Sequence, residues 1–128
     1  METATTKSLM LKVISVLFIC GGAIRLIANR ATFQSFLIGQ LWSSHPYSIY
    51  IYRVLGAFVV FVGISLFIAA GEPRRYAILL RAWSIGFTFI GIVMLVAGAL
   101  LRLAIVHYAP DIVFCFVIAI ALYVAQKQ

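Results

Sequence analysis

The side chains best able to bind a charged group in this sequence are three arginines, Arg25, Arg53 and Arg102, and one acid, Asp111. Arg25 and Arg102 occupy the same place in two similar segments, GGAIRL at 21–26 and GALLRL at 98–103. Guanidinium groups bind carboxylates and phosphates through two parallel hydrogen bonds. The arginines could therefore converge on one anionic group: a lipid phosphate, a ligand carboxylate or an acidic residue of a partner subunit. Alternatively, each could extend to a phospholipid headgroup, with Asp111 pairing with one arginine.

Aromatic and histidine side chains are expected at the mouth of such a convergent site. They are His45, Tyr47, His107, Tyr108 and Trp42. Two histidines and one carboxylate are a ligand set that zinc, copper or iron can use, but the spacing here matches no metal motif. We therefore predict no metal site and, unless a lipid or quinone is bound, no cofactor.

The sequence lacks the residue sets that enzymes and transporters need. It has three acids, Glu2, Glu72 and Asp111, and no Ser-His-Asp elbow, phosphate-binding loop or Cys-His pair. An enzyme normally shows such a convergent set, so we predict no catalytic residues. Proton-coupled transport requires an acid in the middle of a span, and none is expected there. Cys20 and Cys115 lie in apolar runs without CxxC spacing, which is typical of buried small hydrophobes.

The stretch that organises the chain runs from Ala82 to Leu101 without a charged residue. A helix of this length covers about 30 Å, the thickness of a bilayer's hydrocarbon core. Hydrophobic residues make up 65% of the chain and charged residues 10%, against roughly 45–50% and 25% in soluble domains. The net charge is +7, but the basic residues are scattered at span ends. This pattern indicates membrane lipids with anionic headgroups as partners, and no nucleic acid.

We predict an all-α fold, an integral membrane four-helix bundle with up-down-up-down topology in one domain, 1–128. The spans are expected at about 8–28, 48–70, 76–106 and 110–126. An amphipathic stretch at about 31–42 predicts an interfacial helix, which either caps the bundle or covers a cavity as a lid. Gly and Pro at 71–75 predict a tight charged turn. The last connection is expected at 107–111, with Pro110 in the first turn of the fourth span.

Small residues recur every seven positions along the first three spans. In lipid, such residues let helix backbones approach closely, and a period of seven predicts left-handed, nearly antiparallel packing. The glycines expected at helix contacts are Gly22, Gly56, Gly63, Gly91 and Gly98.

The distribution of Lys and Arg predicts the orientation of the chain. With four spans, the side that holds both termini carries Lys7, Lys12, Arg74, Arg75, Arg81 and Lys127, and the other side carries Arg25, Arg30, Arg53 and Arg102. Cytoplasmic loops carry an excess of basic residues. Both termini are therefore expected in the cytoplasm.

Three short motifs resemble a known family. They are an arginine three residues before a glycine in span two (Arg53, Gly56), the turn AGEPRRY at 70–76, and the Gly and Arg near the end of span three. In these the chain resembles the small four-helix bacterial inner-membrane proteins of the DoxX-like group, nearest to members of unknown function. The resemblance implies an up-down-up-down bundle in a bacterial cytoplasmic membrane. DoxX proteins are associated with quinol-oxidising or redox-protective complexes, but no residue motif here carries that role over.

Two functional hypotheses follow from the sequence. The first is a non-catalytic accessory or scaffold subunit that packs against other membrane-protein subunits or against itself as a homo-oligomer. The second is a membrane module that binds a lipid or quinone beneath the interfacial helix, as part of a redox system. A stoichiometric protein partner would support the first hypothesis, and a retained lipid-like molecule would support the second.

Overall fold

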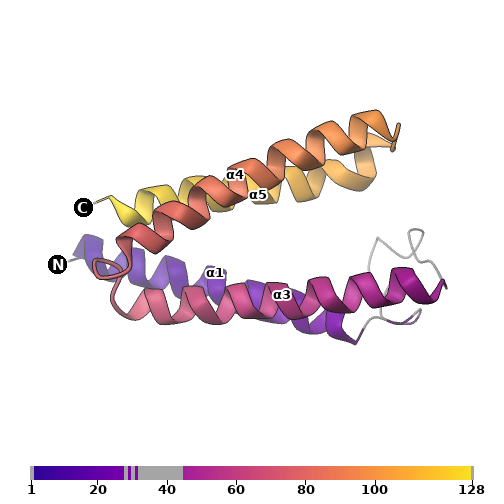
Figure 1. Ribbon diagram of the computed structural model, residues 1–128. Coiled ribbons are helices and arrows are strands. Elements are labelled where there is room, and N and C mark those ends of the chain that lie inside the picture. Colours follow the sequence, from indigo (N-terminus) through magenta and orange to yellow (C-terminus); the bar gives the residue numbers. More distant parts are fainter. Residues whose placement is uncertain (1, 28, 30, 32–44, 128) are drawn as a thin grey trace. The chain divides into compact units, whose positions relative to one another are not determined.

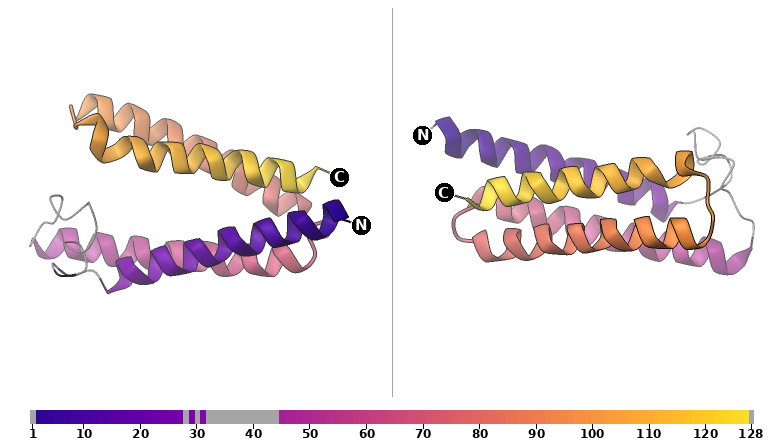
Figure 2. Two further views of the ribbon diagram at one scale, coloured as in Figure 1. Left: turned by 180° about the vertical axis from the view of Figure 1, so that it is seen from behind. Right: turned by 90° about the horizontal axis from the view of Figure 1, so that it is seen from above.

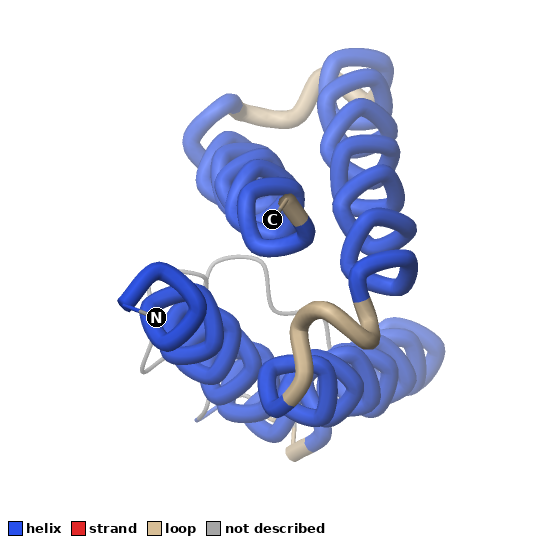
Figure 3. The backbone as a smooth tube through the Cα atoms, turned by 90° about the vertical axis from the view of Figure 1, so that its left-hand side faces the viewer, coloured by secondary structure: helices blue, strands red, loops and turns tan. Residues whose placement is uncertain are grey.

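The computed structural model describes residues 2–27, 29, 31 and 45–127, with the backbone alone at 2–4 and 107. In this part of the chain, the regular structure is helical throughout (Figures 1 and 3). The helices are α1 (Glu2–Leu26), α3 (Pro46–Gly71), α4 (Ala77–Leu100) and α5 (Ile105–Gln126). All four are long and apolar enough to cross a bilayer. The chain is therefore an integral membrane protein, because a helix satisfies its own backbone hydrogen bonds in lipid.

The chain divides into two compact units, Lys12–Ile68 and the combination of Met1–Leu11 with Ala69–Gln128. In the first unit, α1 and α3 run antiparallel, with Ser15 and Ile19 beside Gly63, and Gly22 beside Gly56. A β-carbon added at Gly22 would lie 2.7 Å from the carbonyl oxygen of Gly56. The two helices therefore meet backbone against backbone.

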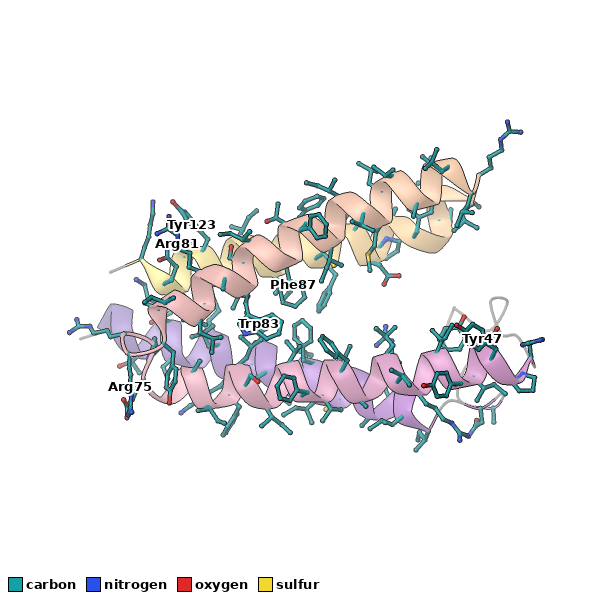
Figure 4. The ribbon with its side chains drawn as sticks, viewed as in Figure 1. Tyr47, Arg75, Arg81, Trp83, Phe87 and Tyr123 are labelled. Carbon is teal, nitrogen blue, oxygen red and sulfur yellow. The ribbon has the colours of Figure 1, made fainter. Side chains whose placement is uncertain are left out.

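In the second unit, α4 and α5 lie side by side and antiparallel (Figures 1 and 2). The hydroxyl of Ser84 donates a hydrogen bond of 2.7 Å to the carbonyl oxygen of Ala119. Further along the pair, Gly91 faces the ring of Phe116. Leu80 and Leu122 are fully buried in this unit. Trp83 and Phe87 lie on one face of α4, with their ring centroids 6.2 Å apart (Figure 4).

The turn between α3 and α4 lies where the sequence places it. The backbone N–H of Tyr76 donates to the carbonyl oxygen of Glu72 at 3.3 Å. An exposed ion pair of 3.5 Å joins Arg75 Nη1 to Glu72 Oε2. Pro73 cannot continue a helix, and the charged side chains remain exposed at the end of the α4/α5 unit.

The connection between α4 and α5 differs from the prediction. The third helix ends at Leu100 rather than near 106, and residues 107–111 lie inside α5 instead of forming the connection. The cause is a C-terminal hydrogen-bonded turn of the Schellman type: Leu103 N–H donates to Gly98 O at 3.0 Å and Arg102 N–H to Ala99 O at 3.2 Å. Arg102 takes the left-handed conformation of this motif, with φ 52°. Pro110 is consequently inside α5 rather than in its first turn.

One predicted element cannot be compared with the structure. The interfacial helix at about 31–42 lies outside the described residues, apart from Ala31. Trp42, expected at the mouth of the site, is also outside them.

Candidate functional site

Arg25 and Arg53 belong to the same unit, and the glycine contact between α1 and α3 determines their positions. A β-carbon on Gly56 would lie 2.8 Å from Cβ of Arg25, so Arg25 begins directly beside Gly56. Arg53 is three residues before Gly56, about one helical turn away. Both arginines therefore lie near one end of this helix pair.

The two arginines differ in their surroundings. Arg25 Nη1 donates a hydrogen bond of 3.2 Å to the carbonyl oxygen of Gly21, so this guanidinium folds back along its own helix. Arg53 is exposed and lines a hollow of about 460 Å³ along α3. The other lining residues in the described part of the chain are Pro46, Ile49, Tyr50, Val54 and Ala57, which form one stripe of the helix. The hollow thus combines one cation with a largely apolar wall.

Arg102 and Asp111 belong to the other unit. Arg102 lies in the turn at 101–104, and Asp111 is in α5, six residues after the first residue of that helix. No ion pair joins the two side chains in the part of the chain that the structure describes. Asp111 is exposed. The sequence predicts Asp111 where the last connection (107–111) overlaps the start of the fourth span (110–126), whereas the structure places it about 9 Å along α5.

Of the residues expected at the mouth, His45 caps α3 and Tyr108 packs on a glycine. His45 Nδ1 accepts a hydrogen bond of 3.2 Å from the backbone N–H of Tyr47, and Pro46 is the first residue of α3. This is an N-terminal capping arrangement, which satisfies a free donor of the helix. The ring of Tyr108 packs on Gly98, where a β-carbon would lie 2.6 Å from Cε2.

Of the other three residues expected at the mouth, Tyr47 is described with its side chain, His107 by its backbone alone, and Trp42 is outside the described residues. The ring of Tyr47 stacks on that of Tyr50 at 6.3 Å and is exposed at the start of α3 (Figure 4). His107 is in α5, but its side chain is outside the described part of the structure. Among the described residues, no three His, Cys, Asp or Glu side chains gather at one point.

Five hydroxyl groups among the described residues have structural roles that the sequence alone does not reveal. Each of the following donates to a backbone carbonyl oxygen: Ser8 to Ala70, Ser15 to Lys12, Ser65 to Phe61, Ser84 to Ala119 and Thr88 to Ser84. Two of these bonds, from Ser8 and Ser84, join different helices. The seven-residue spacing of Ser84, Gly91 and Gly98 predicts that Ser84 lies at a contact between helices. It does not predict that Ala119 O accepts the hydrogen bond of Ser84.

No protein-family model matches this chain, and no curated protein or solved structure is significantly similar to it. The resemblance to DoxX-like proteins therefore stays a prediction. The residues that carry this resemblance are Arg53 and Gly56 in α3, Gly98 in α4, Arg102 after α4, and the turn at 70–76.

Proposed function

We propose that this chain is a small accessory or scaffold subunit of a larger membrane-protein complex, without a catalytic role of its own. The observation that carries the proposal is the use of five hydroxyl groups in the described part of the chain, those of Ser8, Ser15, Ser65, Ser84 and Thr88. They donate to backbone carbonyl oxygens, so they stabilise helices and helix pairs. A backbone carbonyl is not a general base, so these hydrogen bonds do not activate the hydroxyls as nucleophiles.

The exposed apolar side chains of the helices support a partner in the membrane. Five glycines, Gly22, Gly56, Gly63, Gly91 and Gly98, lie at contacts within the helix pairs, whereas bulky apolar side chains remain exposed on every helix. Phe58 is 61% exposed on α3 and Phe89 is 66% exposed on α4. Aromatic rings of this kind supply large contact areas in protein interfaces.

The proposal includes the finer membrane architecture. The four helices cross a bacterial cytoplasmic membrane as an up-down-up-down bundle with both termini inside, and the stretch at 31–42 lies at the opposite surface. The chain is then a DoxX-like protein. The excess of basic residues near the termini and the 72–76 turn supports this orientation.

Affinity purification of a tagged chain from its native membranes tests the accessory role. We expect one or more membrane proteins in fixed stoichiometry. Replacing Phe58 and Phe61 of α3 by Ala, or Phe89 of α4 by Ala, should show which face binds, because at least one variant loses the partner while keeping its helical circular dichroism. Purification of the chain without any stoichiometric protein would contradict the proposal.

A module that binds a lipid or quinone is a second candidate, favoured by the hollow along α3. An amphiphile could place its polar head near Arg53 and Tyr50 and its tail along Ile49, Val54 and Ala57. Ala57→Phe would fill the hollow and should release any quinone or lipid that mass spectrometry detects in the purified protein. Val117→Phe, at an exposed position of α5, is the matched control.

A further inference from the structure

We propose that one end of the α4/α5 unit binds an anionic phospholipid, whose phosphate is held by a cation cluster of Lys7, Arg81 and Lys127 and whose acyl chain lies along α5. The proposal goes beyond the accessory role described above and does not depend on it. All three cations belong to the unit of Met1–Leu11 with Ala69–Gln128. Phosphate oxygens accept hydrogen bonds from ammonium and guanidinium groups, so the chemistry of the cluster suits a phosphate.

Two of the cations, Lys7 and Lys127, lie together. The ammonium group of Lys7 donates a hydrogen bond to the carbonyl oxygen of Lys127. The next residue of α1, Ser8, donates to the carbonyl oxygen of Ala70 at 2.6 Å, which holds this part of α1 at the end of α3. The ammonium group of Lys127 lies 4.8 Å from the ring centre of Tyr123, and both residues are exposed. Cations from α1 and from the end of α5 therefore share one small surface.

Arg81 brings a third cation to the same end of the unit. Ser84 of α4 donates to the carbonyl oxygen of Ala119 in the antiparallel α5. Arg81 is three residues before Ser84, so it is level with the residue three positions after Ala119. Figure 4 shows Arg81 and Tyr123 at this end of the helix pair. Arg81 is exposed, about one turn inside α4, and α4 contains no acid that could pair with it.

The acids of this unit do not neutralise the cation cluster. Glu72 pairs with Arg75 in the exposed turn before α4. Glu2 begins α1, and one carboxylate cannot balance three cations. No ion pair to the cluster is present among the described residues. The other end of the unit is balanced by comparison, because Arg102 and Asp111 supply one charge of each sign. A counter-anion from the surroundings is therefore expected at the cluster.

An exposed apolar stripe leads from the cation cluster along α5. Its members are Val113, Val117, Ile120 and Val124. Their spacing of three and four residues places them on one face of the helix, and Lys127 follows the last of them by three residues. Tyr123, beside the stripe, is of the residue type that gathers at the level of lipid headgroups. Cations above an apolar stripe match a phospholipid, which joins a phosphate to acyl chains, better than a free phosphate or an acidic protein segment.

Native mass spectrometry of the full chain from nanodiscs tests the site with two lipids of equal chain length. Phosphatidylglycerol is anionic, and phosphatidylcholine has no net charge. We expect the parent protein to retain phosphatidylglycerol about tenfold better, because each basic residue near a membrane surface adds to the binding of anionic lipid. Combining Lys7→Gln, Arg81→Gln and Lys127→Gln should remove most of this preference. Arg102→Gln is the matched control, since it removes a cation from the other end of the same unit.

A charge-conserving variant separates lipid binding from loss of the fold. Lys7→Arg, Arg81→Lys and Lys127→Arg together should keep the preference, and both triple variants should keep the helical circular dichroism of the parent. Inorganic phosphate in large excess should not displace phosphatidylglycerol, since it lacks the acyl chains that contact α5.

Four results would overturn the proposal. The first is equal retention of the two lipids by the parent, including the case in which the cation cluster retains an acidic protein instead. The second is an undiminished preference in the triple Gln variant, and the third is an equal loss in Arg102→Gln or in the charge-conserving variant. The fourth is displacement of phosphatidylglycerol by inorganic phosphate, which would indicate a site for the free anion.

Discussion

Glycines lie at the helix contacts of both pairs, but the groups that these glycines face differ between the pairs. Between α1 and α3, glycines bring backbone against backbone, with Gly22 and Gly56 facing each other. Between α4 and α5, glycines make room for aromatic rings, with Gly91 beneath Phe116 and Gly98 beneath Tyr108. At Gly56 an added β-carbon would meet backbone atoms, which cannot move without separating the helices. At Gly98 it would meet only a side-chain ring, which a smaller side chain can replace. Equal glycine spacing in a sequence therefore does not imply equal tolerance to substitution.

The largest effect is expected at the backbone contact. Gly56→Ala would bring a β-carbon 2.6 Å from Leu26 N and 2.7 Å from Gly22 O, so α1 and α3 must separate. We expect a loss of about 3 kcal/mol in unfolding free energy in mixed micelles, the upper part of the usual range for overpacking. Gly86→Ala is the matched control, because its β-carbon meets nothing within 4 Å. Equal unfolding free energies of Gly56→Ala and Gly86→Ala would contradict a close backbone contact between α1 and α3.

A smaller and reversible effect is expected at Gly98. Gly98→Ala should cost about 1–2 kcal/mol, because its β-carbon would lie 2.6 Å from the ring of Tyr108. Combining it with Tyr108→Leu should recover most of the loss, since the smaller side chain leaves the space free. A double-mutant cycle in the same micelles measures this coupling. Additive losses would show that the contact is not between these two residues.

A substitution in the turn between α4 and α5 is expected to raise the unfolding free energy instead of lowering it. Arg102 holds a left-handed conformation, which costs an ordinary residue roughly 1–2 kcal/mol and glycine almost nothing. Arg102→Gly should therefore raise the unfolding free energy, by about 1 kcal/mol at most. A loss of stability would mean that the arginine side chain contributes more than its backbone conformation costs.

The smallest effect is expected for the hydrogen bond between α4 and α5. Ser84→Ala removes a donor to Ala119 O, and interhelical hydrogen bonds in membranes average about 0.6 kcal/mol. Ser65→Ala is the comparison, because Ser65 donates within its own helix to Phe61 O. We expect Ser84→Ala to be the more destabilising of the two in thermal unfolding followed by circular dichroism.

The sequence predicts the helices well and their ends less well. Apolar runs of span length identify all four helices, because a helix satisfies the backbone hydrogen bonds of such a segment within a bilayer. The end of α4 was placed about six residues too late, since a helix C-terminus is normally marked by glycine in the left-handed position and Arg102 occupies it here. The start of α5 is correspondingly earlier than the predicted 110, at Ile105. Contacts such as Gly98 with Tyr108 depend on which helices pair, and spacing along one helix cannot show this.

The most direct test of four crossings in two antiparallel pairs is the accessibility of single cysteines from outside intact cells. After Cys20→Ala and Cys115→Ala, cysteines are placed one at a time at Ser44, Glu72, Leu103 and Gln128. We predict that an impermeant maleimide labels the variants at 44 and 103, and labels those at 72 and 128 only after permeabilisation. Labelling of 44 and 103 from opposite sides would contradict the account, because α3 and α5 would then not begin at one membrane face.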